Sequence, residues 1–374
     1  MTIGIDGSRA FIEGKTGTEN YSYQIIKNLS SIDLKNNYLI YIKKSQVSNL
    51  KSQMWPQNFQ FKIIDLPRLW TQIGLALRTF IDPIDVLFVP SHTLPLIKRP
   101  GLKTVVTVHD LGAEYLPALH QLKQVLYLNL MTHYQLKSAD RIIAVSEATK
   151  ADLINRVQVR KNKVSVVYEA ADEKVFNKIS TDSLQYVLRH FKLQKNKYFL
   201  FVGTIQPRKN LEKIIEAFKV FSESTLGYNL VLAGGKGWKS DTIYDLPQKL
   251  GIGQEVRFIG RVTDEELRAL YNGATGLVYP SLFEGFGLPI VEAFNCGCPV
   301  ITSKISSMPE VAGDSAILVD PYNKEEIAEA LGSLASKDTL RSSLIKKGYL
   351  RSKFFSWRKA AIDTLEVIKS AYLL

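Results

Sequence analysis

Short apolar runs alternate along this chain with stretches whose apolar residues recur at helical spacing. A run without polar alternation predicts a strand that is buried on both faces, as in a parallel sheet. The predicted strands cover residues 2–7, 38–43, 61–66, 86–90, 104–108, 140–146, 164–168, 198–202, 229–233, 278–279 and 300–301, and residues 256–262 are interpreted as a loop. Because strands and helical stretches alternate, the pattern predicts a doubly wound α/β fold.

Three stretches carry an apolar pattern with helical spacing. Residues 21–29 form an amphipathic pattern after a glycine-bearing loop at 14–20, and residues 356–374 form another at the end of the chain. Residues 68–81 are mostly apolar and include two arginines. This stretch fits a helix on a membrane surface, the lip of an acceptor groove or a helix of the core, and the core interpretation is favoured.

The length of 374 residues is sufficient for two domains, each with its own core. The polar, charge-rich segment 172–197 is the predicted boundary between them. We therefore expect one domain at residues 1–185 and a second at 190–355.

Composition narrows the class of protein. Hydrophobic residues make up 45% and charged residues 22% of the chain, as in a soluble globular protein. No basic leader precedes an apolar run, and no stretch reaches the roughly 18–20 apolar residues of a membrane span, so we expect a cytoplasmic protein. Cys296 and Cys298 are too close together for a framework disulfide and too few for a zinc site.

The formal net charge of +12 predicts anionic partners. The sequence contains no arginine-rich arm, zinc finger or basic strand pair with interleaved aromatic residues, so nucleic acid is not the expected partner. A nucleotide diphosphate and an anionic membrane surface both fit, and the charge does not choose between them.

The most informative stretch is 278–293, which reads as a strand, a glycine-bearing loop and a helix opened by Pro289. Gly285 and Gly287 let the backbone come close to a ligand, and the N–H groups of the helix start suit a phosphate. Glu284 and Glu292 should instead accept hydrogen bonds from hydroxyl groups. A ligand that has a phosphate beside a diol is a nucleotide sugar, so the stretch predicts a nucleotide-sugar site. The alternative interpretation of the stretch is an ordinary strand-to-helix turn with two solvated glutamates.

The spacing Glu-x7-Glu within EGFGLPIVEA resembles the signature of the retaining GT-B glycosyltransferases of family 4, and the resemblance covers essentially the whole chain. It implies two Rossmann-like, doubly wound domains that face each other across a cleft. The N-terminal domain would bind the acceptor and the C-terminal domain the nucleotide-sugar donor. It also implies that a C-terminal helix, residues 357–374, crosses back onto the first domain.

The resemblance assigns roles in the first domain. His109 follows the strand at 104–108 and matches a family histidine that approaches the donor sugar, although a satisfied core histidine is the alternative. Gly17 and Thr18 match a loop beside the donor diphosphate and the acceptor, and a flexible surface loop is the alternative.

In the second domain, Lys209 matches a family lysine that neutralises the diphosphate. The family arginine is replaced by Thr204, so we expect Arg208 to supply that charge from a shifted position. The candidate catalytic residues are His109, Glu284, Arg208 and Lys209. The candidate donor-binding residues are Gly17, Thr18, Gly203, Arg208, Lys209, Gly234, Gly260, Arg261, Val262, Gly285, Phe286, Gly287, Leu288 and Glu292.

The sequence contains no Asp-x-Asp pair and no His/Asp/Glu cluster with metal-site spacing, so we expect no metal and no other cofactor. Two cations and a helix start would stabilise the departing nucleoside diphosphate instead. The resemblance implies that the anomeric configuration is retained.

These observations predict a hexosyltransferase that uses a nucleotide sugar and a glycan or lipid-linked acceptor in surface-polysaccharide synthesis, at the inner face of a membrane. The local sequences GTIQPRKN, AGGKGW and SSMPEVAGD favour GDP-mannose, with UDP-glucose and UDP-N-acetylglucosamine as alternatives. A nucleotide-sugar or polysaccharide binding protein without transfer activity and a GT-B epimerase remain alternative functions.

Overall fold

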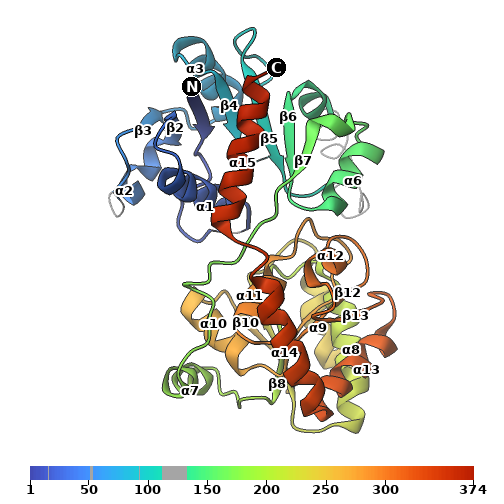
Figure 1. Cartoon of the computed structure of the whole chain (residues 1–374). Helices are drawn as coiled ribbons and strands as arrows, with labels where there is room; N and C mark the ends of the chain where they lie inside the picture. The colour runs from blue at the N-terminus through green and yellow to red at the C-terminus, as the bar shows by residue number, and fades with distance from the viewer. Residues whose placement is uncertain (16, 51–53, 92, 112–132) are drawn as a thin grey trace. The chain divides into compact units, whose positions relative to one another are not determined.

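The structure, a computed structural model, describes residues 1–15, 17–50, 54–91, 93–111 and 133–374. The chain forms two compact units (Figure 1). Unit 1 comprises Met1–Glu169 and Ser356–Leu374, and unit 2 comprises Ala170–Phe355. The chain thus passes into unit 2 just before the segment 172–197 in which the sequence placed the boundary.

Unit 1 is built on a seven-stranded sheet with the order β3-β2-β1-β4-β5-β6-β7, and its strands pair in parallel. The strands are β1 (Thr2–Asp6), β2 (Asn37–Lys43), β3 (Phe59–Ile64), β4 (Val86–Val89), β5 (Lys103–Val108), β6 (Arg141–Ala144) and β7 (Val164–Val166). The helical segments are α1 (Gly17–Ile32), η1 (Lys44–Gln46), α2 (Val47–Leu50), the π-helical turn η2 (Trp70–Leu75), α3 (Ala76–Ile81), α6 (Glu147–Asn155), η4 (Lys161–Lys163) and α15 (Trp357–Tyr372).

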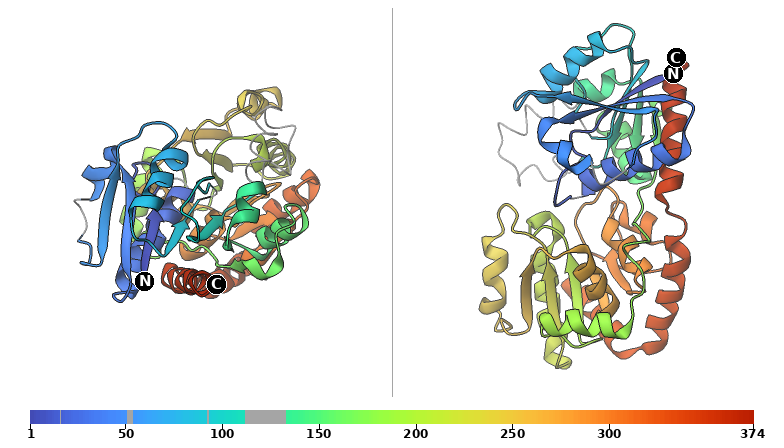
Figure 2. Two further views of the ribbon diagram at one scale, coloured as in Figure 1. Left: turned by 90° about the horizontal axis from the view of Figure 1, so that it is seen from above. Right: turned by 90° about the vertical axis from the view of Figure 1, so that its left-hand side faces the viewer.

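The last helix of the chain completes the core of unit 1. All four residues of β4 are buried, which a central parallel strand requires because helices cover both faces. Helix α15 packs against α1 and over β4, β5 and β6 (Figures 1 and 2). Its buried residues Ala361, Leu365 and Ile368 recur at helical spacing and form the face that covers the sheet.

Unit 2 is built on a six-stranded parallel sheet with the order β10-β9-β8-β11-β12-β13. The strands are β8 (Tyr198–Val202), β9 (Asn229–Ala233), β10 (Val256–Gly260), β11 (Gly276–Tyr279), β12 (Val300–Ser303) and β13 (Ile317–Val319). The helical segments are α7 (Thr181–His190), η5 (Pro207–Lys209), α8 (Leu211–Ser224), α9 (Asp241–Lys249), α10 (Asp264–Gly273), α11 (Leu288–Asn295), α12 (Met308–Ala312), α13 (Lys324–Ser336) and α14 (Asp338–Ser352).

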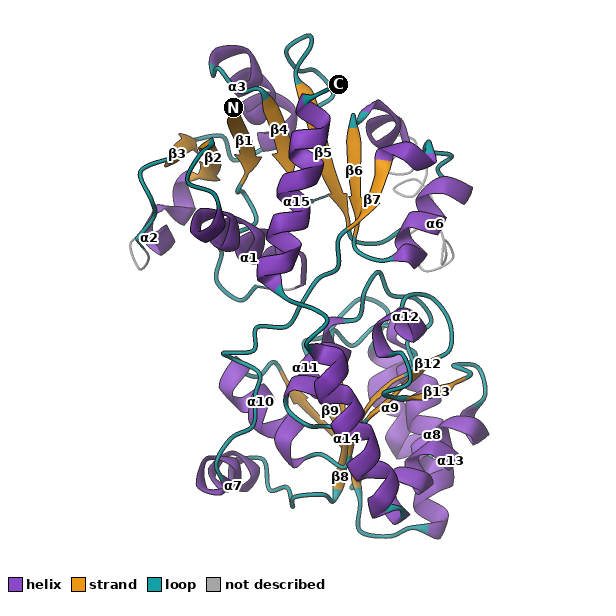
Figure 3. Cartoon of the chain, in the orientation of Figure 1, coloured by secondary structure: helices purple, strands orange, loops and turns teal. Residues whose placement is uncertain are grey.

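Both sheets have the strand order of a doubly wound fold, and helices flank the strands of each (Figure 3). The doubly wound architecture expected from the sequence is confirmed. In unit 2 the order along the sheet reverses direction between β8 and β11. Ligands of open α/β sheets bind beyond the carboxyl ends of the strands at such a switch point. A ligand site is therefore expected at the ends of β8 and β11.

Residues 70–81 of the stretch 68–81 are helical, but the favoured core interpretation is wrong for one face. Trp70 and Leu75 are buried, whereas Ile73, Leu77 and Phe80 are exposed. Periodicity identifies a helix, but a helix that is apolar on most sides does not reveal which side the sheet covers. Within the part of the chain that the structure describes, no helix has the length and apolar character needed to cross a bilayer.

Candidate active site

Four side chains at the switch point of unit 2 form one buried cluster. Arg208 and Lys209 belong to η5, directly after β8, while Tyr279 ends β11 and Glu284 lies in the loop that follows it. Because β8 and β11 are neighbours in the sheet, their carboxyl ends bring these residues together. We call Arg208, Lys209, Tyr279 and Glu284 the Glu284 cluster.

The cluster is held by short polar contacts. Lys209 Nζ donates to Glu284 Oε1 at 2.6 Å and to the Tyr279 hydroxyl at 2.8 Å, and that hydroxyl donates to the same Oε1 at 2.8 Å. Arg208 Nη1 lies 3.6 Å from Glu284 Oε2 and donates to the Phe283 carbonyl at 3.1 Å. Both cations and the carboxylate predicted from the sequence thus lie at one place.

Charge balance keeps Glu284 ionised despite its burial. Burial would raise the pKa of this carboxyl, but the nearby Lys209 and Arg208 lower it below its usual value. Burial and the Glu284 charge raise the pKa of Tyr279 well above its usual value, so its hydroxyl stays protonated and can donate. The cluster is therefore an ionised carboxylate that two cations and a phenol hold in place.

Residues that the sequence did not single out fix the loop carrying Glu284. Ser306 Oγ donates to the Glu284 carbonyl at 2.7 Å, and Ser307 Oγ donates to the Glu284 and Phe286 carbonyls, each at 3.0 Å. Asn210 Nδ2 donates to the Pro280 carbonyl at 3.0 Å. Asn210 has a φ of 62°, a conformation that asparagine tolerates better than most residues. This backbone preference is the local sequence feature that could have indicated that Asn210 holds the loop.

Three of the predicted glycines lie at neighbouring strand ends. Gly203, Gly234 and Gly260 end or follow β8, β9 and β10, and the Gly234 N–H donates to the Gly260 carbonyl at 2.8 Å. Gly234 has a φ of 155°, and a Cβ there would lie 1.9 Å from the Gly203 carbonyl oxygen. Only glycine fits this position, because the Gly203 backbone occupies the space of a side chain, and the three strand ends form a glycine-lined edge.

Arg261 and Val262, two of the candidate donor-binding residues, follow directly after β10. Arg261 is exposed and Val262 is half-buried. The Arg261 side chain lies over Gly235, because a Cβ at Gly235 would be 3.0 Å from Arg261 Nε. The arginine therefore borders the same glycine-lined edge.

Helix α11 begins one residue earlier than predicted, at Leu288, with Pro289 as its second residue. Its N-cap is Gly287, whose φ of 100° favours glycine and which offers no side chain to cap the helix. The Phe286 ring packs edge-on against Phe355, with centroids 5.4 Å apart. Phe286 and the buried Gly285 would therefore contact a ligand through their backbone groups.

Glu292 lies further along α11 and is bound by a tyrosine of α10. The Tyr271 hydroxyl donates to Glu292 Oε2 at 2.9 Å. Burial raises the pKa of Glu292 to about 7, although the bond from Tyr271 acts in the opposite direction. Its charge state therefore changes near neutral pH, in contrast to that of Glu284, whose pKa is lowered.

His109 belongs to unit 1 and follows β5. Its Nδ1 lies 2.8 Å from Glu169 Oε1, and its Nε2 lies 2.9 Å from the Pro90 carbonyl oxygen. Both partner atoms are acceptors, so a doubly protonated ring satisfies both. Burial would lower the pKa of His109, but Glu169 raises it above its usual value. The ring nitrogens are thus engaged within unit 1, and Tyr21 packs edge-on at 4.7 Å.

Gly17 and Thr18 are not in a loop, as the sequence had suggested, but form the first turn of α1. Thr16, in the predicted loop, lies outside the described residues. The Thr18 carbonyl accepts a hydrogen bond from Ser22 Oγ at 2.9 Å. The glycines around this position hid the early start of the helix, because glycine is a weak helix former.

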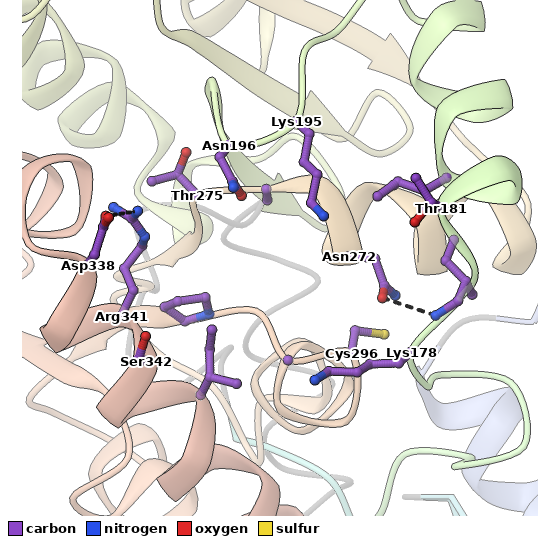
Figure 4. A pocket seen from close by; sticks show the side chains of 16 residues that line it. Lys178, Thr181, Lys195, Asn196, Asn272, Thr275, Cys296, Asp338, Arg341 and Ser342 are labelled. Carbon is purple, nitrogen blue, oxygen red and sulfur yellow. Dashed lines mark hydrogen bonds and ion pairs between the residues drawn. The ribbon is translucent and has the colours of Figure 1, made fainter.

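A pocket of about 520 Å³ lies elsewhere in unit 2 (Figure 4). Its lining includes Asn196 and Pro299, which precede β8 and β12, and Arg341, whose guanidinium donates to Asp338 at the start of α14. These residues precede the strands, whereas the Glu284 cluster follows them. The pocket and the cluster are therefore at opposite edges of the sheet.

A metal site needs several ligands gathered at one place. Among the described residues, no group of three or more histidine, cysteine, aspartate or glutamate side chains is arranged to hold a metal ion. The two cysteines are buried free thiols.

Comparisons with known proteins agree with this geometry. The model of the glycosyl transferases group 1 matches residues 188–351, and the model of glycosyltransferase family 4 matches residues 44–175. O-antigen chain mannosyltransferase B of Escherichia coli is 31% identical over 268 residues, which are 71% of this chain and 70% of the relative. O-antigen chain mannosyltransferase RfbU of Salmonella typhimurium is 30% identical over 262 residues, 70% of this chain and 68% of the relative.

Solved structures resemble the whole chain. Sucrose-phosphate synthase from Thermosynechococcus elongatus superposes with a TM-score of 0.79 at 18% identity, over 100% of this chain and 99% of that one. Anabaena HepE in complex with UDP and glucose gives a TM-score of 0.76 at 17% identity, over 99% and 100%. At these identities the likeness concerns the fold. The two relatives and the two family matches together show that the chain belongs to the family 4 glycosyltransferases and is a glycosyltransferase. Its fold, with two Rossmann-like domains, is of the GT-B type.

Proposed function

We propose that this enzyme transfers a hexose, with retention and without a metal ion, from a nucleotide sugar to a glycan or lipid-linked acceptor in surface-polysaccharide synthesis. GDP-mannose is the proposed donor. The support for mannose and for polysaccharide is that two relatives about as long as this chain are O-antigen chain mannosyltransferases. The proposal also includes a peripheral contact with the cytoplasmic face of a membrane, where a lipid-linked acceptor would be presented.

The observation that carries the proposal is the Glu284 cluster at the switch point of unit 2. A departing nucleoside diphosphate needs positive charge, and Arg208 and Lys209 supply two cations in one buried place. Each charge-assisted hydrogen bond would stabilise the leaving diphosphate by about 1.5–3 kcal/mol. Two cations and the start of α11 could therefore replace a metal ion.

Glu284 has two tasks in this proposal. In the ligand-free protein it keeps Lys209 at 2.6 Å and so holds the cation in position. When donor is bound, Lys209 would be shared with the diphosphate, and the carboxylate would accept a hydrogen bond from a sugar hydroxyl. Glu284 is therefore not the proposed nucleophile. A leaving phosphate oxygen would take the proton of the acceptor hydroxyl on the same face of the sugar, so the configuration is retained.

A donor panel tests the function. Release of nucleoside diphosphate should be fastest with GDP-mannose, and GDP should raise the melting temperature more than UDP does, since a ligand stabilises in proportion to its affinity. Glu284→Gln is the inactive control. Release with none of GDP-mannose, UDP-glucose and UDP-N-acetylglucosamine, or conversion of the donor to its epimer, would overturn the proposal.

The absence of a metal requirement can be tested directly. The transfer rate should be the same in excess EDTA and in magnesium, because the cations of the Glu284 cluster replace the metal. Loss of activity with chelator and its return with magnesium would contradict this expectation.

Glu292 should make donor binding depend on pH. A ribose diol that donates hydrogen bonds needs the ionised carboxylate, and the pKa of Glu292 is about 7. The dissociation constant for the nucleotide should therefore rise about tenfold between pH 8 and pH 6, measured by calorimetry. Glu292→Gln should bind more weakly at pH 8 and lose this pH dependence; a variant with the wild-type profile would exclude Glu292 from the diol site.

A further inference from the structure

A second site lies in unit 2, away from the Glu284 cluster. The pocket of about 520 Å³ has part of its wall on α14, formed by Arg341, Ser342 and Ile345, and we call it the α14 pocket (Figure 4). Its volume is within the range of roughly 300–1,000 Å³ that small-molecule sites have. Because it lies at the opposite edge of the sheet, a ligand there would not exclude a donor from the Glu284 cluster.

The segment that carries Lys178 is held in place at this pocket. Asn272 Nδ2 donates to the Asn177 carbonyl at 2.9 Å, and the Ile179 N–H donates to Asn272 Oδ1 at 3.2 Å. Lys178 Nζ lies 4.9 Å from the centroid of the Tyr349 ring, which is a cation–π contact. The backbone on both sides of Lys178 is therefore fixed, and the aromatic ring supports its side chain.

Lys195 lies on the other side of the pocket. The turn after Lys195 is fixed, because Asn196 has a φ of 58° and its N–H donates to the Gly273 carbonyl at 2.8 Å. Figure 4 shows Lys195 and Lys178 on opposite sides of the pocket, with the Lys195 side chain pointing into it. Among the residues that the structure describes, neither lysine is paired with a carboxylate. Two cations without a counterion thus border one cavity.

The acidic side chain at the pocket is already paired. Asp338 is the one acidic residue among the described residues that line the pocket, and the Arg341 guanidinium donates to it. Arg341 also donates to the Ala335 carbonyl in the last turn of α13 at 3.3 Å. The lining therefore carries three positive charges and one negative charge, and the pocket attracts anions.

Thr275 adds a polar group that has no partner. The Thr275 N–H donates to the carbonyl of Tyr198, the first residue of β8, at 2.8 Å, which fixes its backbone. Its side chain lines the pocket, and the residue is only 1% exposed. Within the described part of the chain, no group forms a hydrogen bond with Thr275 Oγ1. A buried hydroxyl without a partner is unfavourable, so this atom indicates a hydrogen-bonding ligand.

The lining also limits the class of anion. None of the described residues that line the pocket is aromatic, so a nucleobase would have no ring on which to stack. The uncharged polar groups, which include the Asn196 amide and the Thr181 and Ser342 hydroxyls, suit a ligand with several hydroxyl groups. A phosphate ester of a sugar combines an anion with such hydroxyls.

We propose that the α14 pocket binds a phosphorylated sugar, with the phosphate between Lys178 and Lys195 and a sugar hydroxyl bound to Thr275. The charge-assisted hydrogen bonds hold the phosphate, and the bonds to hydroxyls select the sugar ester over inorganic phosphate. The inference goes beyond the proposed function, since it concerns a second ligand and does not depend on which donor the enzyme uses.

Calorimetry with mannose 6-phosphate as the probe tests this site. The full chain should bind the probe at least about tenfold more tightly than mannose or inorganic phosphate, because each of these lacks part of the contacts. The affinity should be the same with and without saturating GDP, since the Glu284 cluster lies at the other edge of the sheet. No binding of the probe, equal affinity for inorganic phosphate, or displacement of the probe by GDP would overturn the proposal.

A pair of lysine substitutions tests the phosphate contact. Lys178→Gln/Lys195→Gln should lower the affinity for mannose 6-phosphate at least about tenfold. Lys219→Gln/Lys324→Gln is the matched control, because it removes the same charge from unit 2 at two lysines that are each paired with a glutamate. The control should bind like wild type. The proposal is overturned if the pocket variant binds as well as wild type, or if both variants weaken binding equally.

Removal of the Thr275 hydroxyl tests the contact with the sugar. Thr275→Val keeps the shape of the side chain and should weaken binding of mannose 6-phosphate about fivefold. The melting temperature without the probe should not fall, because the hydroxyl has no partner among the described residues. Wild-type affinity in Thr275→Val would overturn the proposed contact.

Donor turnover separates this inference from the proposed function. Without mannose 6-phosphate, both pocket variants should release nucleoside diphosphate at the wild-type rate, because neither change touches the Glu284 cluster. Weaker probe binding with unchanged turnover supports a separate site. A wild type that binds the probe but turns over no donor would overturn the proposed function and leave this inference standing.

Discussion

Methionine in place of Lys209 is expected to lower the transfer rate by about 100- to 1,000-fold, the effect of removing one charged donor from a site where negative charge develops. The same change should destabilise the protein by about 3 kcal/mol, since it leaves the buried Glu284 with Arg208 as its remaining cation in the cluster. Enzyme kinetics and thermal melting measure the two effects separately.

A double variant tests whether the uncompensated Glu284 charge causes the loss of stability. Lys209→Met/Glu284→Gln removes the uncompensated charge, so the melting temperature should return most of the way to that of wild type while the rate stays low. Lys213→Met is the matched control, because Lys213 pairs with Glu216 on the partly exposed side of α8. A double variant as unstable as Lys209→Met would mean that the uncompensated Glu284 charge does not cause the loss of stability.

Glutamine in place of His109 is expected to destabilise unit 1 by about 3 kcal/mol at pH 6, because it leaves the buried Glu169 carboxylate without its cation. The pKa of His109 is raised in the folded protein. The stability from the charged ring is therefore complete below its unfolded pKa of about 6.5 and is lost as the pH rises through the folded value. The difference between wild type and His109→Gln should shrink accordingly.

Melting temperatures across a pH series from 6 upward measure this difference. His190→Gln is the matched control, because His190 lies in unit 2 at the exposed end of α7. A difference that stays constant over the whole series would mean that the ring is neutral in the folded protein and that its contacts, not its charge, are stabilising.

The strands of the sheets could be predicted closely where they are buried on both faces. The predicted limits of β8 and β9 are those of the structure, since glycine directly follows the mostly apolar runs Tyr198–Val202 and Asn229–Ala233. Strand β3 was predicted two residues late at both ends, because the polar Gln60 interrupts its start and Leu66 extends the apolar pattern beyond its end. Local sequence determines such elements when tertiary contacts do not override it.

The sequence identified individual residues of the candidate site, but it did not reveal the contacts between them. Arg208, Lys209 and Glu284 were singled out for their charge, and the structure brings them together. The role of Tyr279 was missed, because a tyrosine at the end of a strand has no local feature that reveals its partner. The same holds for Ser306 and Ser307, which contact the Glu284 loop from more than 20 residues away in the sequence.

The contribution of Ser356–Leu374 to unit 1 bears on how the protein is made. A ribosome releases the strands of unit 1 before unit 2, yet the helix that covers β4, β5 and β6 leaves the exit tunnel only after unit 2. Unit 2 is contiguous and can fold as soon as it emerges, because domains fold as units during synthesis. The first half of the polypeptide therefore waits, with part of its sheet uncovered, until Ser356–Leu374 has been made, and a nascent chain stalled before Ser356 would be a natural client for chaperones.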